Sequence, residues 1–214
     1  MLRTIVLNDW LTIFLVLGFS FICLTKFLYE NRFFSYLGVI GNSKYLKIYT
    51  KEQKFIDLFD ALLFVNFTLS AAVFTHISYN TLVTPEPFEL SWFLKLALGI
   101  SSFILIKVLL ERLIGSVFEI DELIDSYLFQ KTSYLNYSGF ILFFSSLFML
   151  FATEPSKALI FTTIGLVTLI NLIGFVTTFK SHQNLLLNNF FYFILYLCTL
   201  EIGPYLISYK IITA

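Results

Sequence analysis

The sequence predicts an all-α protein, a polytopic bundle of about six membrane-spanning helices with short amphipathic helices on the cytoplasmic side. Hydrophobic residues make up 58% of the 214 residues and charged residues only 13%, against about 25% charged residues in soluble domains. The mean hydropathy is +0.84. The long apolar runs lack the alternation of barrel strands, and backbone in hydrocarbon must satisfy its own hydrogen bonds, so helices are expected.

About 20 apolar residues are needed to cross a bilayer, and the chain contains six such runs. The first run is too long for the core of a signal peptide and is not followed by small residues, so it is expected to remain as a span. Aromatic residues such as Trp10, Trp92 and Tyr134 lie near the proposed ends, as is typical of membrane interfaces. Neither a linker nor a repeat divides residues 1–214, which are treated as one integral membrane domain. The predicted spans are residues 10–28, 58–79, 92–114, 134–153, 158–179 and 187–209.

The distribution of basic residues predicts the orientation. Lys and Arg accumulate in short cytoplasmic loops, and most of them here flank the first, third and fifth connections. Both termini are therefore expected outside the cytoplasm. The residues on the cytoplasmic side are Lys26, Arg32, Lys44, Lys47, Lys51, Lys54, Arg112, Lys131 and Lys180, against Arg3, Lys95, Lys157 and Lys210 on the opposite side.

An acidic amphipathic segment, residues 117–129, is expected to form a separate cytoplasmic helix between the third and fourth spans. An acidic polar face is not attracted to anionic lipid, which favours protein as its partner. We expect it to dock on the first cytoplasmic loop through apolar contacts and weak pairs of under about 1 kcal/mol each. An equally open alternative is that both segments are solvated faces of interfacial helices. The candidate docking residues are Glu119, Asp121, Glu122 and Asp125 in the acidic segment and Lys44, Lys47, Lys51 and Lys54 in the loop.

Polar residues inside the predicted spans pair on helix faces. Asn66 and Ser70 are four residues apart, and Thr168 and Asn171 are three apart, so each pair shares a face. In membrane bundles such residues commonly form hydrogen bonds between helices. That role is favoured over a substrate site.

Glu201 is the most informative residue, because it lies inside the sixth apolar run, three residues before Pro204. A carboxylate at membrane depth costs several kcal/mol unless it is protonated or partnered, and Pro204 removes a helix hydrogen bond and predicts a kink. Lys95, Lys107 or Glu111 of the third span, or His76, could approach it, and the choice stays open. A structural role is favoured over a proton or ion pathway.

Several classes of function are disfavoured. Fourteen basic and fourteen acidic residues balance, so nucleic-acid binding is not expected. The sequence carries no catalytic motif, and the protein is not expected to be an enzyme. Cys23 and Cys198 lie in apolar runs, and neither His76 nor His182 has a second ligand at zinc spacing, so no cofactor or metal is expected.

The last span carries a resemblance to a known family. Its residues Tyr196, Leu197, Cys198, Glu201, Pro204 and Lys210 follow the closing pattern of that family. Lys107 in an apolar helix is a second, less specific similarity. The chain therefore resembles multi-pass membrane proteins of Bacteroidota labelled domain of unknown function four-two-seven-one, which implies a Gram-negative inner membrane.

These observations together predict a non-enzymatic inner-membrane subunit or assembly factor of a larger envelope complex. Its expected partners are the lipid bilayer and other membrane proteins. By analogy, secretion and gliding machines are candidate hosts. The alternative is a proton- or ion-coupled transporter of small solutes that uses Glu201.

Overall fold

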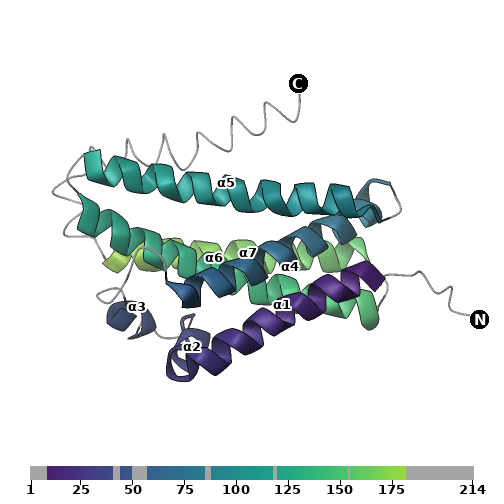
Figure 1. The fold of residues 1–214 in the computed structure, drawn as a ribbon, viewed down its shortest axis with the longest axis horizontal. Helices are drawn as coiled ribbons and strands as arrows, with labels where there is room; N and C mark the ends of the chain where they lie inside the picture. Colours follow the sequence, from purple (N-terminus) through teal and green to yellow (C-terminus); the bar gives the residue numbers. More distant parts are fainter. Residues whose placement is uncertain are drawn as a thin grey trace, which may run out of the picture.

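The computed structural model describes residues 9–40, 44–49, 57–84, 88–117, 120–153 and 155–181. These residues form seven helices, five of which are long and apolar enough to cross a membrane. The all-α membrane bundle predicted from composition is confirmed (Figure 1). The long helices are α1 (Asp9–Leu28), α4 (Leu58–Leu82), α5 (Leu90–Val117), α6 (Asp121–Phe151) and α7 (Lys157–Ser181), and the short ones are α2 (Glu30–Leu37) and α3 (Lys44–Tyr49).

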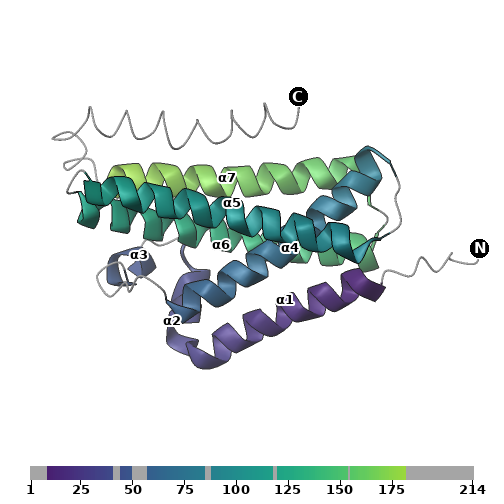
Figure 2. The same ribbon diagram turned by 45° about the horizontal axis from the view of Figure 1, so that its top comes forward.

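Five of the six predicted spans correspond to these long helices, with most boundaries within about three residues. The sixth predicted span, residues 187–209, lies outside the described part of the chain. The short helices α2 and α3 both fall in the connection between α1 and α4, and Figures 1 and 2 place them at one end of the bundle. The α5–α6 connection lies at that same end, the α2–α3 end.

Helices α4 and α6 form the centre of the bundle. They make the most extensive helix contact and are the most buried of the long helices. Helix α1 packs on α4, α7 packs on α6, and α5 contacts both central helices (Figure 2). Gly139 allows the close approach of α6 to α4, because a Cβ at this position would lie only 2.8 Å from the Cα of Phe67.

The prediction of a separate acidic helix before the fourth span is wrong. Helix α6 runs without a break from Asp121 to Phe151, so the acidic segment supplies its first turns, and α5 continues to Val117. The acidic segment joins α6 because its apolar side chains are buried and because it packs closely against the end of α5. Ile124 and Tyr127 are buried, and Gly115 lets Ile124 come so near to α5 that an added Cβ would meet it at 2.9 Å.

Candidate functional site

A bend between α1 and α2 creates the candidate site at the α2–α3 end. Helix α1 ends at Leu28, Tyr29 takes a non-helical conformation, and α2 begins at Glu30. The bend directs Arg32 toward the beginning of α4. There Asp57 caps the helix, because its side chain accepts a hydrogen bond from the Phe59 amide at 3.2 Å.

Arg32 joins three segments through its guanidinium group. It pairs with Asp57, donates from Nη2 to Asp60 Oδ2 at 3.1 Å, and lies with Nε 3.4 Å from the Tyr45 hydroxyl. Its guanidinium carbon is 4.3 Å from the centre of the Phe59 ring, a cation–π distance. These contacts, within a largely buried site, hold α2 and α3 against the beginning of α4.

The surroundings of Arg32 also set the ionisation of nearby groups. Burial alone would lower the pKa of Arg32, but Tyr45, Asp57 and Asp60 outweigh it, and the net pKa is raised. Burial raises the pKa of the Tyr36 and Tyr45 phenols above their ordinary value. Arg32 is therefore a permanent cation surrounded by neutral phenols and two carboxyl groups.

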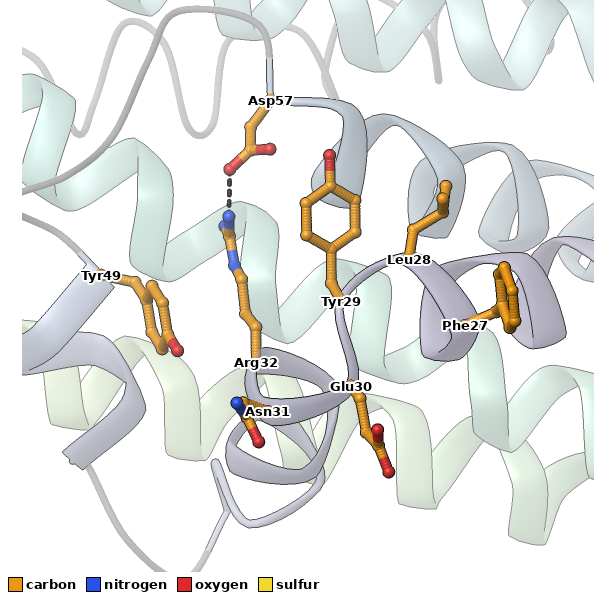
Figure 3. Close-up of a pocket in the computed structure, with 8 residues that line it drawn as sticks. All are labelled: Phe27, Leu28, Tyr29, Glu30, Asn31, Arg32, Tyr49 and Asp57. Carbon is orange, nitrogen blue, oxygen red and sulfur yellow. Dashed lines mark hydrogen bonds and ion pairs between the residues drawn. The ribbon is translucent and has the colours of Figure 1, made fainter.

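An open pocket of about 470 Å³ lies beside Arg32. Figure 3 shows Arg32 and Asp57 paired on one side of it, while Phe27 lies on the far side and Glu30 points away from Arg32. The Phe27 side chain is 85% exposed. The pocket thus joins a charged wall to an apolar rim, and its lining residues are Phe27, Leu28, Tyr29, Glu30, Asn31, Arg32, Tyr49 and Asp57.

A second charged group lies inside the bundle, between α5 and α6. Glu111 is fully buried and accepts a hydrogen bond from Lys131 Nζ at 2.6 Å. Lys107 lies one turn before Glu111 on α5 and is only 7% exposed. Arg112 and Asp125 form a looser, half-exposed pair at 3.5 Å nearby.

A family model described as Domain of unknown function (DUF4271) matches residues 11–212. The chain belongs to this family. The match confirms the resemblance carried by the closing residues of the sequence. It covers the described helices except for the first two residues of α1, and most of the residues beyond α7. Neither a curated protein nor a solved structure matches the chain.

The intramembrane candidates of this DUF4271 chain fall in different places. Lys107 and Glu111 lie together inside the bundle, whereas Lys95 is exposed. Asn66 is buried, and its Oδ1 accepts from the Ser70 hydroxyl within α4 at 3.5 Å. Glu201 and Pro204 lie outside the described residues.

The two residues of α7 that were predicted to bond other helices, Thr168 and Asn171, make different hydrogen bonds. Asn171 Nδ2 donates to Ser138 Oγ of α6 at 2.8 Å, which joins the two helices. Thr168 is exposed and bonds to the Ile164 carbonyl of its own helix. Only Asn171 of this pair makes a bond between helices in the described structure.

The acidic segment and the connection between α1 and α4 contact each other through aromatic rings. Tyr45 of α3 stacks on Phe129 of α6 with 5.8 Å between ring centres. Asp121 is exposed, while Asp125 pairs with Arg112 of α5. The other docking candidates lie outside the described residues or have side chains outside them: Glu119, Glu122, Lys44, Lys47, Lys51 and Lys54.

The contacts among Arg32, Asp57 and Asp60 are not predicted from the sequence, where Arg32 indicates only the orientation of the first loop. One signal was available, because Asp57 directly precedes an apolar run and aspartate is a preferred N-cap residue. Among the described residues, no group of three or more His, Cys, Asp or Glu side chains could hold a metal ion.

Proposed function

We propose that this DUF4271 protein is a non-enzymatic inner-membrane subunit or assembly factor of a larger bacterial envelope complex. One observation carries the proposal: the described buried charges connect elements to one another. Arg32 connects α2 to α4, and Lys131 of α6 pairs with Glu111 of α5. Charges arranged in this way hold helices in a single arrangement, as a structural bundle requires.

The α2–α3 end is the proposed contact surface for partners, on the cytoplasmic side. It carries the pocket beside Arg32 and several exposed apolar side chains, including Phe27, Phe34 and Leu37. A rigid surface that combines aromatic groups with a central Arg is typical of protein interfaces. Secretion and gliding machines are the candidate hosts.

Purification of the tagged full-length chain in mild detergent tests the proposal. Stoichiometric companion proteins are expected with the wild-type chain and with Leu98→Ala, which changes an exposed residue in the middle of α5. Phe27→Ala at the pocket rim should reduce their recovery. A chain that purifies without companion proteins would contradict the proposal. Equal recovery of the companions with Phe27→Ala and Leu98→Ala would contradict the proposed surface.

A proton- or ion-coupled transporter that uses Glu201 is the second candidate function. The observation that favours it is Glu111, a fully buried carboxyl group beside Lys131 within the spans. Ionisable residues at membrane depth are common in proton relays. Glu201→Gln separates the two functions: loss of solute movement in liposomes with normal assembly favours transport, and loss of assembly favours the structural role.

A further inference from the structure

We propose that the pocket beside Arg32 binds the headgroup of an aminophospholipid, with the phosphate at Arg32 and the ammonium group at Glu30. Both residues line this open pocket of about 470 Å³, a volume within the usual range of small-molecule sites, about 300–1,000 Å³. A lipid ligand of this kind goes beyond the proposed role as a subunit or assembly factor. It can be measured on the chain purified without companion proteins.

The pocket lies at the level where two membrane-spanning helices end. Helix α1 ends at Leu28 and α4 begins at Leu58, and Leu28 is one of the lining residues. The 20 residues of α1 from Asp9 to Leu28 rise by about 30 Å at about 1.5 Å each, which is the thickness of the hydrocarbon core. Lipid phosphates and amines are therefore found at the level of the pocket.

An exposed apolar face of α1 leads from the pocket toward the middle of the bilayer. Leu17, Leu24, Phe27 and Leu28 are all exposed, and their spacings of three, four and seven residues place them on one side of the helix. A lipid whose headgroup enters the pocket can lay its acyl chains along this face. A charged pocket that adjoins an apolar face fits an amphiphile better than a water-soluble ligand.

Arg32 has donors for a phosphate group. A guanidinium carries five N–H donors, and the contacts of Arg32 with described residues use three of them: Nη1 with Asp57, Nη2 with Asp60 and Nε with Tyr45. One donor on each Nη nitrogen remains. Arginine binds phosphate oxygens well through such neighbouring donors, so the phosphate is placed at this wall of the pocket.

The charges of the pocket favour a headgroup that also carries a cation. Arg32 is the positive residue of the lining, whereas Glu30 and Asp57 are both acidic, and Asp60 adds a carboxyl group beside Arg32. A purely anionic headgroup would therefore meet an excess of negative charge. An ammonium group next to the phosphate removes this mismatch.

The position of Glu30 suits the ammonium group. Glu30 points away from Arg32, and Phe27 lies on the far side of the pocket from Arg32 (Figure 3). Carboxylates and aromatic faces both attract an ammonium group. A primary ammonium can also donate hydrogen bonds to the Glu30 carboxylate, which a quaternary choline cannot do. The geometry thus favours an ethanolamine-type headgroup.

Native mass spectrometry of the full-length chain tests the ligand. Delipidated protein in detergent is mixed with equal amounts of phosphatidylethanolamine, phosphatidylcholine and phosphatidylglycerol, and bound lipids are identified by mass. One phosphatidylethanolamine per chain should be retained, about fivefold over each of the others. Soluble phosphoethanolamine at the same concentration should not be retained. Equal retention of the three lipids, or retention of the soluble compound as strong as that of phosphatidylethanolamine, would overturn the proposal.

Charge variants at Glu30 test the position of the headgroup. Glu30→Gln should lower the retention of phosphatidylethanolamine by about fivefold. Glu30→Lys should reverse the preference in favour of phosphatidylglycerol, a change that unfolding cannot produce. The matched controls are Glu89→Gln and Glu89→Lys, at an exposed position that precedes α5 at the opposite end of the bundle (Figure 1). These should keep the wild-type preference. The same lipid retention in the Glu30 and Glu89 variants would show that the pocket does not bind the headgroup.

Discussion

At the scale of single residues, Arg32 has the most connected side chain of the candidate site. Its planar guanidinium reaches Asp57 and Asp60 at once and leaves the Phe59 ring against its face. Such a fork cannot be reproduced by lysine, which presents a single ammonium group. The site is therefore expected to depend on the shape of this residue as well as on its charge.

Arg32→Gln should lower the free energy of unfolding in detergent by about 3 kcal/mol, because it leaves Asp57 and Asp60 without their cation in a largely buried site. Arg32→Lys should lose less, since it keeps the charge. The control Lys26→Gln, at an exposed position, should cost under about 1 kcal/mol. Thermal unfolding followed by fluorescence measures the three variants. Equal losses for Arg32→Gln and Lys26→Gln would show that the cluster adds no stability.

The phenol of Tyr45 predicts a dependence of stability on alkaline pH. Burial raises its pKa in the folded protein, so the folded chain keeps this proton at a pH where the unfolded chain has released it. The stabilisation is complete below the ordinary tyrosine pKa of about 10 and is lost as pH rises above it. Tyr45→Phe should therefore lose less free energy of unfolding than the wild type between about pH 9 and 11. Parallel pH profiles would contradict this.

At the scale of helices, close crossing of α4 and α6 organises the bundle. Gly139 faces the Phe67 backbone of α4, where a methyl group would meet main-chain atoms. Backbone of a second helix cannot move aside as a flexible side chain can. The crossing thus depends on the absence of a Cβ at this one position.

Gly139→Ala should lower the free energy of unfolding by about 1–3 kcal/mol, because α4 and α6 must separate to admit the methyl group. Gly165→Ala is the matched control, since an added Cβ on α7 meets no atom within 4 Å. That control should be neutral or slightly stabilising. The midpoint of thermal aggregation, read by fluorescence size-exclusion chromatography, compares them. Similar midpoints would mean that the two helices are less tightly packed than described.

At the scale of the whole molecule, the described helices place the α1–α4 connection and the α5–α6 connection at the same end of the bundle (Figure 1). Most basic residues lie at or near that end in the sequence. The positive-inside rule predicts that this end faces the cytoplasm. The pocket beside Arg32 would open on the cytoplasmic side.

Reporter fusions test this orientation. A reporter enzyme active only in the periplasm should be active when fused after Ala214, and inactive when inserted within residues 51–56. Immunoblots confirm equal expression of the two fusions. A silent fusion at Ala214 together with an active one in the loop would reverse the topology and place the pocket outside the cytoplasm.

The sequence alone determined that the protein lies in a membrane, that it is helical, and the approximate limits of five spans. Each apolar run enters the hydrocarbon because of the hydrophobicity of its own residues, about 20 of them, and not because of distant parts of the chain. Only the tertiary structure decided which charges meet. Arg32 and Asp60 are 28 positions apart, and Glu111 and Lys131 are 20 apart. Such pairs depend on helix crossings and turns, and small features such as Gly115 determine how closely the helices approach. The acidic segment forms the beginning of α6 for the same reason: the residues that bury it, such as Tyr45, are distant in the chain.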